Sequence, residues 1–128
     1  MDKKFPDKYK DKLTPEQYNI CFRQGTEPPG SGKWLHHDAE GMYVCAACEQ
    51  ELFKSNTKFD SSTGWPSFWN PTAKSNVKTV DDNSMGVHRL EVQCSNCHAH
   101  LGHVFDDGPA PTGKRYCINS LALNFKEK

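Results

Sequence analysis

Two Cys-x-x-Cys pairs constrain the fold of this chain more than any other feature of its sequence. Cys45 pairs with Cys48, and Cys94 pairs with Cys97. The spacing lets both sulfurs of a pair reach one metal ion at about 2.3 Å, and two such pairs complete a tetrahedral zinc shell. We therefore predict one structural four-cysteine zinc site. It would stabilise the fold and leave no open position for a substrate.

Two other uses of these cysteines fit the sequence less well. A redox Cys-x-x-Cys belongs in a βαβ context, and the sequence shows no such pattern. A secreted disulfide framework would use all six cysteines, which allow 15 connectivities. The N-terminus has charges where a signal peptide has an apolar region, and no window approaches the roughly 18 apolar residues of a membrane span. We expect a reducing, cytoplasmic setting, which suits thiolate ligands.

The composition is ordinary for one soluble domain. The 128 residues are 35% hydrophobic and 25% charged. We expect a single domain over residues 1–128, with a loosely ordered lead-in over residues 1–12, and a monomer. The 16 basic and 16 acidic residues cancel, so no overall field would attract nucleic acid or an anionic membrane. Any partner must be recognised locally.

The N-terminal part contains a helix start signal. Thr14 is a suitable N-cap, Pro15 suits the first helical position, and Gln17 can close a capping box. We predict a helix of about two turns that ends near Cys21. The glycines and prolines of Gly25–Gly32 exclude regular structure, so a loop should follow.

Beyond this loop, helical periodicity is absent and short β-favouring runs recur between turn residues. In the last run, Leu121, Leu123 and Phe125 alternate with Ala122 and Asn124, which is typical of a strand with one buried face. The predicted fold is mostly antiparallel β with one short N-terminal helix. The predicted strand runs are Gly41–Cys45, Val77–Val80, Gly86–Cys94, Leu101–Phe105 and Tyr116–Phe125.

Three histidines, His98, His100 and His103, follow the second cysteine pair where the chain enters the predicted strand Leu101–Phe105. Because four cysteines already fill a zinc shell, His100 and His103 are free for proton transfer. The alternative is that they are partly exposed strand residues with no chemical role. The other histidines lack such a context and are expected at the surface: His36, His37 and His88.

Cys117 lies apart from both pairs and follows Arg115 by two residues. A positive charge nearby would favour its thiolate. A lone cysteine with histidines elsewhere is a candidate nucleophile. An arbitrary cysteine is nevertheless more often a small buried hydrophobe in a strand.

The segment Gly64–Trp69 is unusually aromatic, with Trp65, Phe68 and Trp69 beside a proline. These rings could line an apolar pocket. For Phe68 and Trp69 we favour the simpler interpretation that they complete the core of a β domain.

Together, these blocks resemble the methionine-R-sulfoxide reductases, the MsrB family. The resemblance spans about residues 13–125 and implies a zinc-containing β-tent fold of two antiparallel sheets. It also implies an enzyme that reduces the R epimer of methionine sulfoxide in oxidised proteins, with thioredoxin as reductant. The blocks that carry it are the two cysteine pairs, Gly64–Phe68, His100–Phe105 and Arg115–Ser120.

The resemblance assigns roles to the ambiguous residues. The Cys117 thiolate would attack the sulfoxide sulfur and become a sulfenic acid, while His103, with His100, would protonate the oxygen. Trp65 would pack against the substrate's S-methyl group. The remaining two positions that match the family's active site are Arg115, as electrostatic support, and Asn119, as the group that orients the histidines or water.

One position departs from the family pattern. Many members carry a resolving cysteine just before the Gly-Trp-Pro-Ser-Phe motif, where this chain has Thr63. With four cysteines on zinc, Cys21 is the remaining free thiol, so we hypothesise that a mobile N-terminal arm brings Cys21 to Cys117 to form a disulfide. Otherwise Cys21 is a buried spectator and an external thiol attacks the sulfenic acid.

A rival interpretation comes from another class of protein. A non-catalytic zinc-ribbon or β-tent binding module with an aromatic cage would explain the zinc ligands and the tryptophans. It would not explain why Cys117, His100 and His103 all match catalytic positions of the family.

Overall fold

The computed structural model describes residues 13–23, 25–83 and 86–127, so the lead-in predicted for residues 1–12 lies outside the described residues. Helix α2 spans Pro15–Phe22. The Thr14 hydroxyl accepts a hydrogen bond from the Gln17 amide at 3.1 Å, and the Gln17 side chain accepts one from the Thr14 amide at 3.0 Å. This reciprocal capping box starts the helix where the sequence predicted it.

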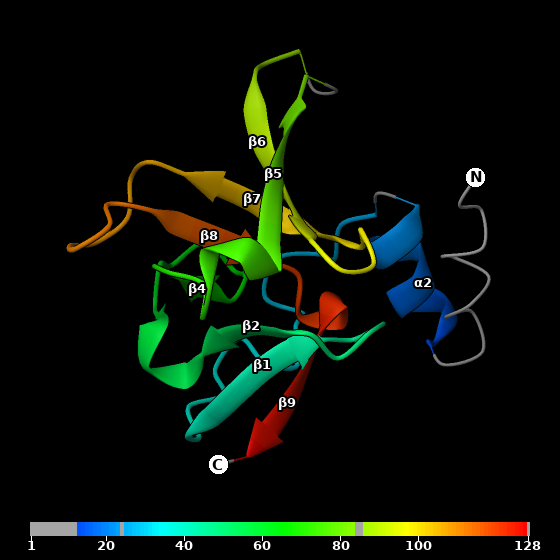
Figure 1. Ribbon diagram of the computed structural model, residues 1–128, viewed down its shortest axis with the longest axis horizontal. Coiled ribbons are helices and arrows are strands. Elements are labelled where there is room, and N and C mark those ends of the chain that lie inside the picture. The colour runs from blue at the N-terminus through cyan, green and yellow to red at the C-terminus, as the bar shows by residue number, and fades with distance from the viewer. Residues whose placement is uncertain (1–12, 24, 84–85, 128) are drawn as a thin grey trace.

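Two antiparallel sheets form the body, and the smaller lies below the larger in the view of Figure 1. The smaller sheet has the strand order β2-β1-β9, and its strands are β1 (Gly41–Cys45), β2 (Glu51–Lys54) and β9 (Leu123–Glu127). The larger has the order β3-β4-β8-β7-β6-β5. Its strands are β3 (Lys58–Phe59), β4 (Ser67–Phe68), β5 (Val77–Asp82), β6 (Arg89–Cys94), β7 (His100–Phe105) and β8 (Arg115–Ile118). The predicted fold class is confirmed.

Aromatic rings fill the space between the sheets. The rings of Phe53 from β2 and Phe68 from β4 stack with centroids 4.4 Å apart, and Tyr43 from β1 meets Phe68 edge-on at 5.2 Å. All three are 0% exposed. Burying side chains of this size stabilises the fold by roughly 1.5–3 kcal/mol each. The core therefore joins the two sheets, and Phe68 has the core role predicted for it.

The two faces of the large sheet have different surroundings. Val92, Val104 and Ile118 belong to the buried core cluster. Since side chains alternate along a strand, the residue next to each of these three in its own strand points to the opposite face of the sheet. That second face carries His103 and Cys117, which are only partly buried. The alternation thus separates a packing face from a face available for chemistry.

The prediction of one strand over Tyr116–Phe125 is wrong. The chain leaves the large sheet after Ile118, makes a 3-10 turn at Ser120–Ala122 (η3), and enters the small sheet as β9. This turn is the short red helical piece between the sheets in Figure 1. Ala122 is 0% exposed and lies in the core, against the predicted alternation. The hydrophobic pattern of this run does not reveal that its first part belongs to one sheet and its last part to the other.

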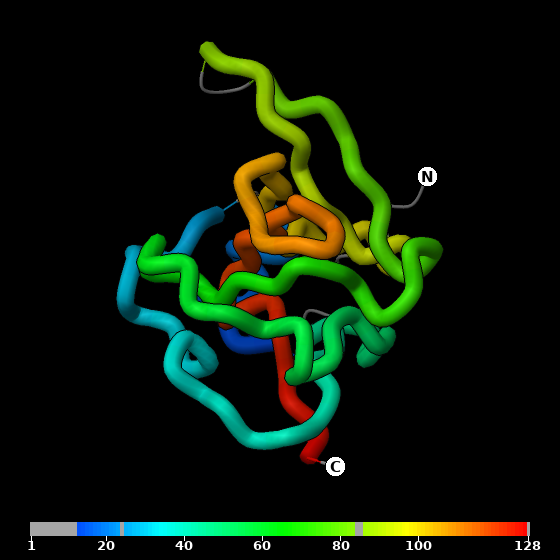
Figure 2. The backbone as a smooth tube through the Cα atoms, turned by 90° about the vertical axis from the view of Figure 1, so that its left-hand side faces the viewer, coloured from blue at the N-terminus to red at the C-terminus, as the bar shows by residue number. Residues whose placement is uncertain are grey.

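Other strand boundaries differ less. Strand β1 matches its prediction, β5 continues two residues beyond Val80, and β6 begins three residues after Gly86. Strands β2, β3 and β4 were not predicted because two to four residues show no clear alternation. The predicted loop is irregular, and Figure 2 shows residues 25–40 along the outside of the molecule. Within residues 13–23, 25–83 and 86–127, no helix is long and apolar enough to span a membrane.

Candidate active site and metal centre

The four cysteines of the two pairs come together as predicted. Their sulfur atoms all lie within 4.8 Å of one another. The sulfurs of Cys45 and Cys97 are 3.6 Å apart, and those of Cys48 and Cys94 are 3.5 Å apart. Four sulfurs arranged tetrahedrally at about 2.3 Å from one ion are separated by about 3.8 Å. The geometry therefore fits a four-thiolate metal site of the zinc type.

The two Cys-x-x-Cys turns have the same backbone construction. The amide of Glu49 donates to the Cys45 carbonyl at 2.9 Å, and that of His98 donates to the Cys94 carbonyl at 2.8 Å. Glu49 and His98 have φ values of 66° and 65°, the left-handed conformation that a tight turn requires. One turn joins β1 to β2 and the other joins β6 to β7. A bound ion would therefore tie a hairpin of the small sheet to one of the large sheet.

Strand register places the candidate nucleophile opposite a histidine. In the large sheet, His103 on β7 and Cys117 on β8 are directly paired, and Cys117 is paired on its other side with Ser67 of β4. Directly opposite residues of antiparallel strands have Cβ atoms about 4.5–5.5 Å apart on the same face. The thiol and the imidazole are therefore neighbours.

A β-bulge brings the second histidine to the same face. His100 and His103 are three positions apart, so a regular strand would point them to opposite faces. The pairing of β6 with β7 shifts between Val92 and Gln93, which leaves Leu101 as the extra residue. The imidazole rings of His100 and His103 consequently meet edge-on with centroids 5.6 Å apart.

Cys117, the candidate nucleophile, lies in the wall of a cavity of about 310 Å³. Its wall includes four of the residues predicted for the site in addition to Cys117. Three loop segments and three strands contribute side chains. The lining residues are Thr26, Thr63, Trp65, Arg89, Gly102, His103, Phe105, Arg115, Cys117 and Asn119.

Opposing effects set the ionisation of the Cys117 thiol. Burial raises the pKa of the Cys117 thiol, whereas a hydrogen bond from the Thr63 hydroxyl and the charge of Arg115 lower this pKa. The Arg115 guanidinium is held by Asp107 through bonds of 2.8 and 3.1 Å, and it lies over the Phe105 ring at 4.4 Å. Arg115 thus supplies the favourable charge that the sequence suggested, from a fixed position.

Each histidine of the site is bound to its own carboxylate. His103 Nε2 lies 2.7 Å from Asp82 Oδ2, and His100 Nδ1 lies 2.7 Å from Glu91 Oε2. Burial lowers the pKa of His103, while the bond to Asp82 raises it. Sequence reasoning missed both carboxylates. Glu91 could have been suspected, because a charged residue on the buried strand β6 needs a partner.

Trp65 and Asn119 converge on the backbone of one loop residue. Trp65 Nε1 donates to the Glu27 carbonyl at 3.0 Å, and the Glu27 amide donates to Asn119 Oδ1 at 3.1 Å. Asn119 Nδ2 in turn donates to the Leu101 carbonyl at 3.0 Å. Both of these Asn119 bonds go to main-chain groups. The asparagine anchors the outer loop beside Trp65.

Thr63 has a larger role than its sequence position suggested. Besides its bond to Cys117, Thr63 Oγ1 lies 2.8 Å from Ser61 Oγ, which lies 2.7 Å from Ser67 Oγ. Three linked hydroxyl groups therefore lie near Cys117, which is paired with Ser67 in the sheet. In the sequence, Thr63 was notable only because many family members have a cysteine at this position.

Cys21 lies apart from the cavity. It is 2% exposed on α2, and it does not line the cavity around Cys117. Burial raises the pKa of Cys21 to about 12, and the nearby Cys94 and Cys48 add to the effect. The structure therefore places Cys21 in the core beside the four clustered cysteines. In this conformation the N-terminal segment does not bring it to Cys117.

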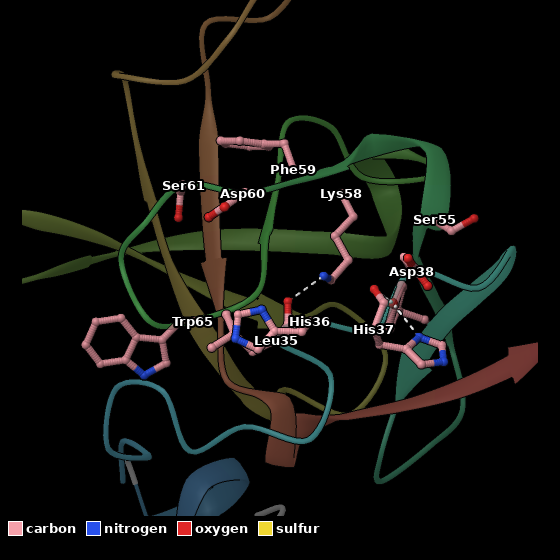
Figure 3. A pocket seen from close by; sticks show the side chains of 11 residues that line it. Leu35, His36, His37, Asp38, Ser55, Lys58, Phe59, Asp60, Ser61 and Trp65 are labelled. Atoms are coloured by element: carbon pink, nitrogen blue, oxygen red, sulfur yellow. Dashed lines mark hydrogen bonds between the residues drawn. The ribbon is translucent and has the colours of Figure 1, made fainter.

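A second cavity, of about 320 Å³, has Trp65 in its wall but no cysteine. Figure 3 shows Trp65 at one end of it and Lys58 donating to the Leu35 carbonyl, at 2.8 Å. His37 lies on this wall, with Nδ1 3.0 Å from the Tyr43 hydroxyl. The prediction that His37 is a surface residue is therefore wrong, because its ring packs against an aromatic cluster. The other two predicted surface histidines, His36 and His88, are exposed.

Comparisons with known proteins match this chain to a family. The model of the SelR domain family matches residues 13–127. The protein named peptide methionine sulfoxide reductase MsrB of Methanosarcina barkeri is 55% identical over 123 residues, which cover 96% of this chain and 87% of that protein. The protein of the same name from Synechococcus sp. is 50% identical over 120 residues, with 94% and 88% covered. This chain therefore belongs to the SelR domain family of peptide methionine sulfoxide reductases, MsrB.

Proposed function

We propose that this protein reduces methionine-R-sulfoxide in oxidised proteins to methionine, with Cys117 as the nucleophile. Family membership supports the enzyme class. The observation that carries the proposal is the direct pairing of Cys117 with His103 inside a cavity that also contains Trp65. Sulfoxide reduction by a thiol requires a nucleophile and a proton donor, and an apolar wall can hold the S-methyl group of the substrate.

The reaction balances with one thiol. The Cys117 thiolate attacks the sulfoxide sulfur and forms an S–S bond, while His103 protonates the sulfoxide oxygen. The oxygen then passes as hydroxide from the substrate sulfur to Cys117, so the S–O bond and the new S–S bond both break and the substrate gains two electrons. Cys117 loses the same two electrons and takes the oxygen as a sulfenic acid. Protonation is needed because an unprotonated oxygen is a poor leaving group. His100 touches the His103 ring and is proposed to assist this proton transfer.

The remaining cavity residues are proposed to bind and orient the substrate. The Trp65 indole offers an apolar face to the S-methyl group, and the bond from its Nε1 to Glu27 fixes the ring. Asn119 holds the same loop residue from the other side. Arg115 stabilises the thiolate before attack.

We infer that the metal is one structural zinc ion, held by Cys45, Cys48, Cys94 and Cys97. The sulfur geometry supports this inference, as does the preference of zinc for four thiolates. A shell of four protein ligands has no place for a substrate, so these cysteines contribute to folding and the chemistry stays with Cys117.

Regeneration of Cys117 is proposed to use Cys21. The Cys21 thiol would attack the sulfur of the sulfenic acid, so that a Cys21–Cys117 disulfide forms and water leaves. Thioredoxin would then reduce this disulfide. Because Cys21 is buried on α2, this step requires the helix to leave its packing. None of the six cysteines forms a disulfide in this structure, which is consistent with the proposed cytoplasmic setting. We further propose that the protein acts as a monomer.

The proposal is tested with the separate R and S epimers of a blocked methionine sulfoxide and with dithiothreitol as reductant. Wild type should reduce the R epimer alone, and Cys117→Ser should reduce neither. Folding of the variant is checked by circular dichroism. A folded, metal-loaded wild type that reduces neither epimer would refute the proposal and favour the binding-module interpretation.

A further inference from the structure

The hairpin of β5 and β6 contributes a carboxylate to the active-site face of the large sheet. The hairpin projects from the body of the molecule in both Figure 1 and Figure 2. Asp82 ends β5 and is paired with Arg89 at the start of β6. Asp82 Oδ2 lies 2.7 Å from His103 Nε2 and 3.2 Å from Arg89 Nη2. One carboxylate therefore joins a projecting hairpin to the proposed proton donor.

We propose that Asp82 is a positioning residue that fixes the ring of His103 and stabilises its proton-bearing form for transfer to the sulfoxide oxygen. This inference rests on the proposed function, and in particular on His103 as the acid. A carboxylate bound to one imidazole nitrogen sets both the ring orientation and the tautomer. Asp82 itself would not touch the substrate.

The burial of the pair makes this contact effective. The side chains of Asp82 and His103 are 14% and 15% exposed. In such surroundings a charge interaction is screened less than it would be at the surface. The second histidine of the site has the same arrangement, since His100 is bound by the buried Glu91. Each imidazole of the site is therefore held by a carboxylate from a neighbouring part of the sheet.

Asp82 also opposes the other groups that shift the pKa of His103. Burial lowers the pKa of His103, and the charges of Arg89 and His100 lower it further, whereas Asp82 raises it. Without Asp82, less of the histidine would carry a proton at neutral pH. The ionisable groups around His103 are Asp82 on β5, Arg89 and Glu91 on β6, His100 on β7, and Arg115 and Cys117 on β8.

The direction of the expected change in pH dependence follows from the role of His103 as an acid. A proton donor works in its protonated form, so activity declines as the pH rises through the pKa of His103. Asp82→Asn keeps the size of the side chain but removes its charge, which lowers that pKa. The declining limb of the pH profile should then move to lower pH. One unit of movement lowers the protonated fraction about tenfold at any pH above both pKa values.

The experiment compares Asp82→Asn with Asp81→Asn. Asp81 is the neighbouring carboxylate, is exposed, and binds His88, so it controls for loss of one charge on the same hairpin. We would measure kcat/KM for the R-sulfoxide against pH, and follow the His103 ring proton by NMR titration. We expect about a tenfold loss at neutral pH and a lower His103 pKa for Asp82→Asn, and neither change for Asp81→Asn.

Two further observations keep the test decisive. Asp82→Glu retains the charge and should recover much of the lost activity, which a general packing defect would not predict. An unchanged pH profile and an unchanged His103 titration in folded Asp82→Asn would overturn the inference. That result would leave the proposed function intact if wild type reduces the R epimer, so the two failures are distinguishable.

Discussion

Replacing one of the metal-binding cysteines should unfold much of this protein. Cys94→Ser is the most informative change, because Cys94 is 0% exposed and lies at the end of β6 where the two hairpins meet. A serine hydroxyl is not ionised at neutral pH and is a poor zinc ligand. The substitution thus breaks the link between the small sheet and the large sheet.

The size of the effect can be worked from the site. Binding of zinc to four-ligand sites in small domains contributes about 10–16 kcal/mol, and the net stability of a domain is only about 5–15 kcal/mol. Loss of even about 5 kcal/mol would lower the thermal midpoint by about 20 °C, at roughly 4 °C per kcal/mol for a domain of this size. The matched control is Cys21→Ala. Cys21 is buried in the same core but is not one of the four clustered cysteines.

The assay combines metal content with thermal unfolding followed by circular dichroism. Wild type should bind one zinc ion and lose stability when a strong chelator is added, whereas Cys94→Ser should bind little metal and melt early. Cys21→Ala should bind zinc normally and lose only the roughly 0.5–3 kcal/mol typical of point substitutions. A metal-free Cys94→Ser protein with the midpoint of wild type would refute the reasoning.

Three further predictions concern the active site. Thr63→Ala removes a hydrogen bond that lowers the pKa of Cys117, so alkylation of this thiol by iodoacetamide should shift to higher pH; an unchanged pH dependence would contradict this. Cys21→Ser should retain turnover with dithiothreitol and lose most turnover with thioredoxin, and equal rates with both reductants would exclude Cys21 as the resolving thiol. A Cβ atom on Gly102 would collide with the Cys117 carbonyl, so Gly102→Ala should lose activity and stability together, as measured by kcat/KM and urea unfolding; a stable, active variant would show that β7 and β8 can separate without cost.

Local sequence signals determined several elements of this protein correctly. The capping box defined the start of α2, and the Cys-x-x-Cys spacing predicted the metal site, because both depend on residues within one turn of chain. The same holds for β1, whose five residues match the predicted run. Cys117 was singled out as a candidate nucleophile because it lies apart from both cysteine pairs and matches the nucleophile position of the MsrB family.

The tertiary structure decided what depends on contacts between distant segments. The bulge at Leu101 turns His100 toward His103, and no periodicity in one strand can show a change of register against its neighbour. Asp82 reaches His103 only because β5, β6 and β7 are adjacent in one sheet. The sequence therefore determined which reactive groups are present, whereas strand register determined which of them face one another.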